Sequence, residues 1–216
     1  MMLTALEILE RNPRGYFLMV EGGRIDHGHH YGNAFRALTE TIEFAHAVGV
    51  ASERTNAEDT LIVVTPDHGH VFTIGGYPTR GNDILGLTIE NDIRGHPAEE
   101  PALDALGLPF TTLGYQNGPG YTGPSNQQPE GPKFHPHRAR IFSGITQGRP
   151  DLTEVDTADP DYLQEVAVPM RSETHSGEDV PAYARGPGSR LFRGVREQNY
   201  IFHAIVEALG WNPSPE

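Results

Sequence analysis

The chain has 216 residues, 37% of them hydrophobic, and its 29 acidic and 16 basic side chains give a formal charge of −13. This length can bury one sizeable core, while 25 glycines and 18 prolines predict many turns and long loops. The acidic balance argues against nonspecific nucleic-acid binding, and the absence of cysteine excludes disulfides and thiolate metal ligands.

The apolar runs of the chain are short. The two longest lie at residues 16–20 and 61–64, and both are far too short to span a bilayer. The first residues lack the basic and apolar regions of an export signal, and residues 208–216 lack the hydrophobic stretch of a lipid-anchor signal. The sequence therefore predicts no transmembrane segment and shows no readable export signal.

Four elements are predicted in the first third of the chain. Apolar side chains at helical spacing indicate helices over residues 4–12 and 33–50, and short apolar runs indicate buried strands over residues 16–20 and 61–65. A helix between two such strands favours a parallel βαβ unit, in which ligand groups gather beyond the carboxyl ends of the strands. We therefore expect an α/β fold with its chemistry at that edge.

The remainder of the chain is dominated by a segment without clear periodicity. Residues 73–169 are rich in glycine, proline and polar side chains, which predicts a loop-rich insertion within the same domain, with one strand over residues 110–115. Beyond the insertion, the pattern predicts a strand over residues 180–184 and a helix over residues 197–209, which Gly210 closes.

Two carboxylates and three imidazoles follow the first predicted strand within ten residues. They occur in the string EGGRIDHGHH as Glu21, Asp26, His27, His29 and His30. Zinc without cysteine takes histidine nitrogen and carboxylate oxygen, and Asp26 and His30, four residues apart, can face one ion from a single helical turn. The alternative for any one of these residues alone is a solvated, histidine-rich turn.

A second cluster of acid and imidazole follows the second predicted strand. It is the string PDHGH, which contains Asp67, His68 and His70. Such a string is often only a turn, but two clusters at the same edge of a sheet favour a metal site. Far downstream, His175 lies in the string SETHSGED, where the residues taken alone indicate a surface turn.

Six strings in order resemble the alkaline phosphatase family, especially the branch shared by animal and similar bacterial enzymes. They are VEGGRIDHGHH, ALTETIEFAHAV, TLIVVTPDHGH, GGYPTRGNDILG, ETHSGEDVPAYARGP and GVREQNYIFHAI, and they extend from about residue 15 to residue 209. The fourth and fifth strings favour this family over phosphodiesterases, sulfatases and phosphoglycerate mutases, which share the metal-ligand pattern.

The resemblance implies a fold and a reaction. The fold would be part of a three-layer α/β/α sandwich, a single domain over residues 1–216 whose segment 73–169 forms a crown-like insertion. The reaction would be hydrolysis of phosphate monoesters through a phosphoserine, at a site with two Zn²⁺ ions and one Mg²⁺ ion. Intact members of the family are commonly homodimers and are periplasmic or extracellular.

The resemblance also implies metal ligands. In chain order these are Glu21, Asp26, His30, Asp67, His68 and His175. Asp26, His30 and His175 would hold the first zinc, Asp67 and His68 would contribute to the second, and the glutamate of the set would reach the magnesium. His70 resembles an outer position of the family site. His27 and His29 flank the motif. Five further histidines are expected to be structural or on the surface, namely His46, His96, His135, His137 and His203.

Part of the family site is absent from this sequence. The serine nucleophile, the arginine that grips phosphate and the bridging aspartate belong to the family's first half, and none of their motifs is found here. We therefore expect a C-terminal part that is inactive alone. The alternative is a noncatalytic metal-binding or split-protein half that requires an N-terminal partner chain.

Overall fold

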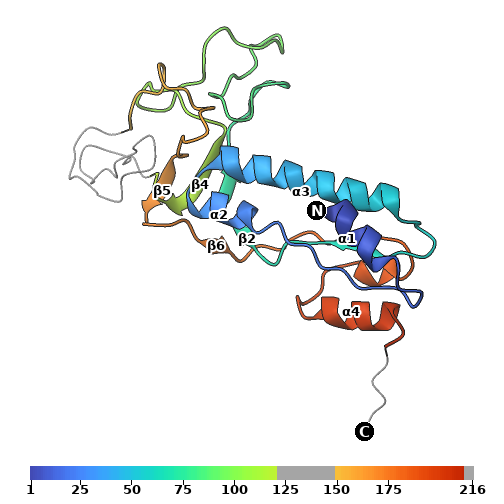
Figure 1. The fold of residues 1–216 in the computed structure, drawn as a ribbon. Coiled ribbons are helices and arrows are strands. Elements are labelled where there is room, and N and C mark those ends of the chain that lie inside the picture. Colours follow the sequence, from blue (N-terminus) through green and yellow to red (C-terminus); the bar gives the residue numbers. More distant parts are fainter. Residues whose placement is uncertain (121–148, 212–216) are drawn as a thin grey trace. The chain divides into compact units, whose positions relative to one another are not determined.

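The computed structural model describes residues 1–120 and 149–211 (Figure 1). The chain divides into two compact units. Unit 1 consists of Met1–Glu21, Ile42–Gly69 and Gly177–Glu216, and unit 2 of Gly22–Thr41 and His70–Ser176. Among the described residues, three helices are followed by seven short strands and then by two further helices, and one of the sheets is mixed, in agreement with the predicted α/β class. Within the described ranges, no helix combines the length and the apolar character that crossing a membrane requires.

Unit 1 is built from short elements. Its helices are α1 (Met2–Leu9), α4 (Tyr200–Ala208) and the 3₁₀ helix η1 (Ser189–Phe192), and its strands are β1 (Ile62–Val64) and β7 (Tyr183–Arg185). The two strands pair antiparallel, with Val63 opposite Ala184. Strand β1 lies within one residue of its predicted range, whereas β7 begins three residues after the predicted start at residue 180. Helix α4 ends before Gly210, which has the expected left-handed backbone (φ 63°).

The predicted βαβ unit is wrong in two respects. Residues 16–20 form no strand, and Phe17, Met19 and Val20 are exposed rather than buried. Strand β1 pairs with β7 and runs antiparallel to it, so no parallel crossover links residues 16–20 to β1. The physical reason is that an apolar run becomes a buried strand only where a neighbouring strand pairs with it, and among the described residues the partner of β1 is β7.

Unit 2 contains the helix α2 and two small sheets. Helix α2 is Arg24–His30, and α3 (Ala34–Arg54) begins in this unit and continues into unit 1. One sheet has the order β3 (Phe72–Ile74), β4 (Leu113–Gly118), β5 (Val166–Pro169), with β3 antiparallel and β5 parallel to β4. Strands β2 (Gly69–His70) and β6 (His175–Ser176) form the second sheet.

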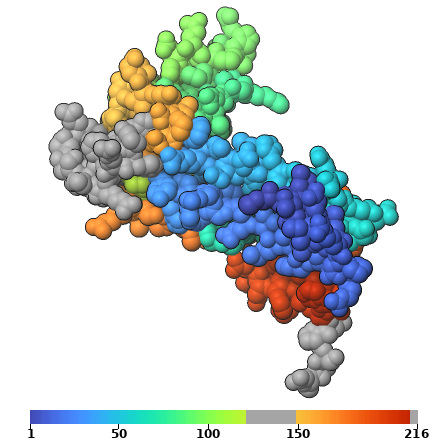
Figure 2. Space-filling view, in the orientation of Figure 1, coloured from blue at the N-terminus to red at the C-terminus, as the bar shows by residue number. Residues whose placement is uncertain are grey.

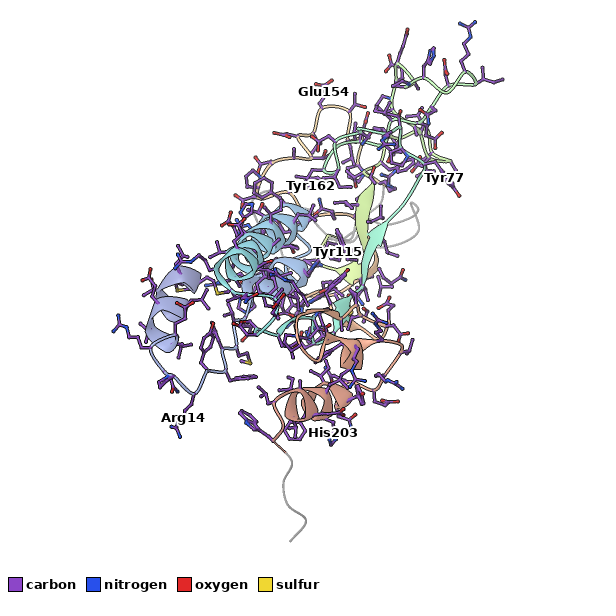
Figure 3. All side chains as sticks on the ribbon, turned by 90° about the vertical axis from the view of Figure 1, so that its right-hand side faces the viewer. Arg14, Tyr77, Tyr115, Glu154, Tyr162 and His203 are labelled. Carbon is purple, nitrogen blue, oxygen red and sulfur yellow. The ribbon has the colours of Figure 1, made fainter. Side chains whose placement is uncertain are left out.

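The core of unit 2 lies on the three-stranded sheet and under the start of α3. Tyr115 and Val166 are buried partners on β4 and β5, with Phe72 packed against them (Figure 3). The fully buried Asn33 caps α3, because its Oδ1 accepts the Arg36 N–H at 2.9 Å. The buried Gln164 adds a second cap, since its Oε1 accepts the Ala34 N–H at 2.7 Å.

The loop-rich segment contains three turns with the same pattern, D-x-x-G. They begin at Asp83, Asp92 and Asp104, and in each the Oδ1 atom of the aspartate accepts the N–H two residues later at 2.8 to 3.0 Å. The carbonyl of each aspartate also accepts the glycine N–H three residues later, at 3.0 Å. Two hydrogen bonds within each turn therefore help to hold residues 83–107 in a defined path between β3 and β4.

An ion cluster joins two parts of this segment. Arg149 Nη2 donates to Glu165 Oε2 at 2.6 Å, and Arg149 Nη1 donates to Asp104 Oδ2. Figure 2 shows the green and orange segments that carry these residues side by side. The predicted insertion over residues 73–169 stays an interpretation; its glutamine- and proline-rich part, with His135 and His137, lies outside the described residues.

Helices α2 and α3 approach each other closely at Gly28. A Cβ atom added to Gly28 would lie 2.7 Å from the Ala37 backbone nitrogen, a distance at which something must shift. We expect Gly28→Ala to lower the free energy of unfolding by about 1–3 kcal/mol through overpacking. Denaturant titration of the whole chain measures this change.

Gly49→Ala is the matched control, because Gly49 also lies inside a helix but its added Cβ would meet nothing within 4 Å. Removal of a helical glycine there should raise the free energy of unfolding, by up to about 1 kcal/mol. Equal effects of the two substitutions would contradict the close approach at Gly28.

Candidate metal centre

Four of the side chains in unit 2 converge from three short elements. Asp26 and His30 lie one turn apart on α2, His70 ends β2, and His175 begins β6. The β2–β6 pairing places His70 and His175 side by side, and α2 contacts both through its half-buried carboxylate and imidazole. Residues about 145 positions apart in the chain therefore share one cluster.

The donor atoms of three of these residues form a small triangle. Asp26 Oδ1 lies 3.3 Å from His30 Nε2 and 3.2 Å from His175 Nε2, and the two Nε2 atoms lie 3.2 Å from each other. His70 Nε2 lies 3.1 Å from the same Asp26 oxygen. Two zinc bonds of about 2.05 Å at a tetrahedral angle would separate their donor atoms by about 3.3 Å. The triangle therefore has the size of one face of a tetrahedral zinc site.

The opposite sides of two imidazoles are tied to hydrogen-bond acceptors. His30 Nδ1–H donates to the Glu173 carbonyl oxygen at 2.7 Å, and His70 Nδ1 lies 2.7 Å from the Glu173 carboxylate oxygen Oε2. A carbonyl only accepts, so the proton of neutral His30 is on Nδ1 and its Nε2 lone pair points at Asp26. A lone pair facing a carboxylate is repulsive unless a cation lies between them, and carbonyl or carboxylate partners at the second nitrogen are typical of metal-ligating histidines.

The electrostatics of Asp26 follow from this arrangement. Burial raises its pKa, but the positive charges that His30, His70 and His175 carry when protonated, together with the hydrogen bond to His175, outweigh burial and hold the pKa of Asp26 below its ordinary value. Asp26 is therefore ionised near pH 7, and a metal ion requires this form of a carboxylate ligand.

One wall of the cluster is aromatic. The His29 ring stacks on His70 with centroids 4.5 Å apart, and His29 Nδ1 lies 2.8 Å from the Tyr115 hydroxyl. Burial, and next the neighbouring His70, lower the pKa of His29 to about 4, and burial raises the pKa of Tyr115. Both groups are therefore neutral near pH 7. His29 is a packing residue that fixes the plane of His70.

The remaining predicted ligands belong to unit 1. Glu21 and Asp67 are exposed, the Asp67 carbonyl accepts from Gln198 Nε2 at 2.6 Å, and His68 Nε2 lies 3.4 Å from Asp67 Oδ2. Their distances to the cluster of unit 2 stay a prediction. His46, His96 and His203 are exposed, as the sequence predicted.

Sequence reasoning missed Glu173 and undervalued His70. Glu173 is 1% exposed and contacts both His30 and His70. Its only sequence signal is its place two residues before His175. Nothing local to residue 173 predicts its partners, because they come from segments more than 100 positions away.

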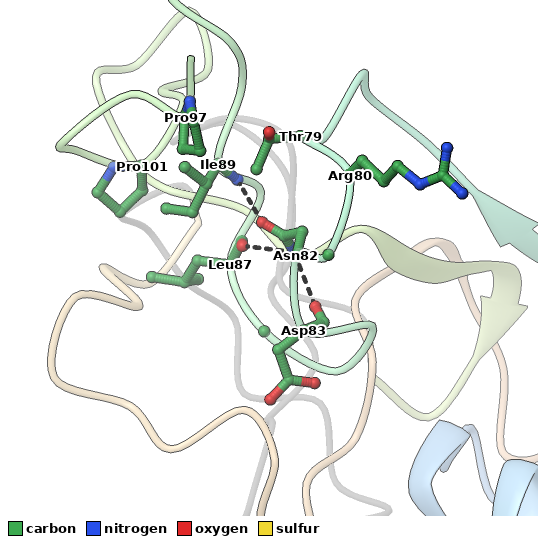
Figure 4. Close-up of a pocket in the computed structure, with 10 residues that line it drawn as sticks. Thr79, Arg80, Asn82, Asp83, Leu87, Ile89, Pro97 and Pro101 are labelled. Carbon is green, nitrogen blue, oxygen red and sulfur yellow. Dashed lines mark hydrogen bonds between the residues drawn. The ribbon is translucent and has the colours of Figure 1, made fainter.

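A hollow lies in the loop-rich segment (Figure 4). None of the residues that line it belongs to the histidine cluster. The hollow has a volume of about 540 Å³ and lies among residues 79–101. Asn82 shapes it, since its Oδ1 accepts the Ile89 N–H at 2.9 Å and its Nδ2 donates to the Leu87 carbonyl at 3.2 Å. Arg80 and Asp83 are the ionisable residues of its lining, and no chemistry follows from them.

The chain matches the family model described as alkaline phosphatase over residues 1–211. It is similar to the tissue-nonspecific isozyme of alkaline phosphatase from Gallus gallus, with 45% identity over 99% of this chain and 35% of that protein. The Homo sapiens isozyme is 44% identical over 96% of this chain and 34% of that protein, and the alkaline phosphatase of Gadus morhua is 43% identical over 96% and 37%. The chain thus spans about a third of the length of these relatives. Similarity along nearly the whole chain establishes that it belongs to the alkaline phosphatase family.

Proposed function

We propose that Asp26, His30 and His175 hold a zinc ion, and that the chain is part of a metal-dependent phosphomonoesterase. The observation that carries the proposal is the triangle of donor atoms, with edges of 3.2 to 3.3 Å. One carboxylate and two imidazoles, with no thiolate in the chain, are the ligand types that zinc takes in hydrolytic sites.

The ligand set also suits a phosphate substrate. When bound, zinc supplies Lewis-acid stabilisation to a phosphoryl oxygen. One ionised carboxylate and two neutral imidazoles leave a divalent ion with net positive charge, which attracts a phosphate dianion despite the acidic chain. The Nδ1–H bond of His30 to the Glu173 carbonyl holds that imidazole in the orientation and tautomer that ligation requires.

The family supplies the rest of the proposed site. Asp67 and His68 would contribute to a second zinc, and Glu21 would reach a magnesium, for which a hard carboxylate oxygen is suitable. Phosphate monoester hydrolysis, a homodimer and a periplasmic or extracellular location are proposed for the whole protein, because the curated relatives named alkaline phosphatase are about three times as long as this chain.

A half that needs a partner chain is the second candidate. The exposed apolar side chains of Phe17, Met19 and Val20 favour it, since a run of this kind ordinarily packs in a sheet. The partner would be the N-terminal half that carries the nucleophile.

Zinc uptake by the metal-free chain tests the proposed site. We expect about one zinc ion to bind tightly, with magnesium binding much more weakly, because three donors of suitable type converge in unit 2. Isothermal titration calorimetry combined with native mass spectrometry gives the affinity and the stoichiometry. Absence of tight zinc binding, or equal binding by Asp26→Ala, would overturn the assignment.

A further inference from the structure

Glu173 is a carboxylate without access to solvent. Its side chain is 0% exposed, and it precedes β6, between α2 and β2. Burial of an ionised carboxylate is costly unless hydrogen bonds satisfy its oxygens. The hydrogen bonds of Glu173 therefore indicate why the fold keeps an acid there.

Glu173 contacts both neighbouring elements of the proposed site. Its Oε1 accepts the Val71 N–H at 2.9 Å, and its Oε2 lies 2.7 Å from His70 Nδ1. Its backbone N–H donates to the His30 carbonyl at 3.0 Å, and its own carbonyl accepts from His30 Nδ1 at 2.7 Å. Glu173 thus contacts the Nδ1 atoms of both His30 and His70, the two imidazoles whose Nε2 atoms face Asp26.

We propose that Glu173 is a positioning residue: its carboxylate keeps a proton on His70 Nδ1, and the unprotonated Nε2 atom of that imidazole is thereby directed toward Asp26. The proposal rests on the metal site proposed above for its functional meaning. His30 Nδ1 lies 2.7 Å from the backbone carbonyl oxygen of Glu173 and 3.5 Å from its carboxylate oxygen Oε2. A side-chain substitution leaves the shorter contact in place, so its main effect falls on His70.

Glu173→Gln tests the proposal with little change in volume. An amide has one accepting oxygen and one donating nitrogen. If the oxygen keeps the Val71 N–H bond, the amide nitrogen faces His70 Nδ1, which must then accept. The proton of His70 moves to Nε2, the atom that faces Asp26. Outer partners of metal sites typically contribute 10- to 100-fold to affinity, so we expect zinc affinity to fall by about that factor.

The first measurement is long-range ¹H–¹⁵N NMR of the histidine rings in the metal-free 216-residue chain at alkaline pH. We expect His70 Nδ1 to be protonated in the parent chain and unprotonated in Glu173→Gln. Zinc titration of both proteins follows. Glu154→Gln is the matched control, because Glu154 is exposed in the same unit; it should change neither the spectrum nor the affinity.

The outcomes separate the two proposals. A parent chain with unprotonated His70 Nδ1 would overturn the role of Glu173, even if Glu173→Gln did not fold. Equal zinc affinity and an unchanged His70 spectrum in Glu173→Gln would overturn it as well. A parent chain that binds no zinc, but shows the expected shift of the His70 proton, would support the role of Glu173 and remove only the metal site.

Discussion

Replacement of His175 by alanine should weaken zinc binding to the 216-residue chain by more than about 100-fold, beyond the loss expected for an outer partner. The reason is geometric: His175 Nε2 closes two of the three edges of the donor triangle, at 3.2 Å from both Asp26 Oδ1 and His30 Nε2. Without it, the proposed ligand set keeps only Asp26 and His30, both on α2, and two ligands leave the ion largely hydrated. Competition titration with a chromogenic chelator measures the difference.

His46→Ala is the control for this experiment. His46 is exposed on α3, and its ring lies 3.5 Å from the Glu43 carboxylate, so its removal should leave zinc affinity unchanged. Equal losses in His46→Ala and His175→Ala would indicate scattered surface binding by histidines. Unchanged affinity in His175→Ala would contradict the proposed ligand set.

The second expected result concerns catalysis. The purified chain, loaded with zinc and magnesium, should hydrolyse an aryl phosphate at alkaline pH about 10⁴-fold or more below an intact enzyme of the family, because loss of a nucleophile from such a constellation costs several orders of magnitude. None of the family's nucleophile motifs is found in this sequence. Release of the aryl alcohol, followed by absorbance, measures the rate.

Addition of a fragment that carries the missing half should restore turnover. Restored activity should then disappear in His175→Ala and persist in His46→Ala. Turnover by the chain alone that His175→Ala abolishes would mean that another group attacks phosphorus directly. Turnover by the chain alone that His175→Ala leaves unchanged would identify a contaminant.

The sequence predicted helices better than strand pairing. Apolar spacing located α3, and the four-residue separation of Asp26 and His30 placed both on α2, because helical contacts are local. The prediction of a strand over residues 16–20 was wrong, because an apolar run does not specify its partner. Strand β1 pairs with β7, which lies more than 100 positions away in the chain. The motif resemblance supplied His175, which residue patterns alone had placed in a surface turn.

Glu173, which contacts the histidines of the cluster, was harder to predict than the residues that supply the donor atoms. Histidines and aspartates stand out in a sequence because their types match a metal, whereas a glutamate such as Glu173 has no such mark. The role of Glu173 follows from its burial and from its contacts with residues that lie 102 to 143 positions away in the chain. Such roles become visible only when distant segments are packed together.

The three D-x-x-G turns differ in how far a change of length in each should spread. The turns at Asp83 and Asp92 close their hydrogen bonds within five residues. Asp104, which begins the third turn, also accepts from Arg149, and Arg149 binds Glu165 next to β5. An insertion in either of the first two turns should therefore disturb the three-stranded sheet less than an insertion in the third, because among the described residues only the third turn is tied to the chain beyond β4.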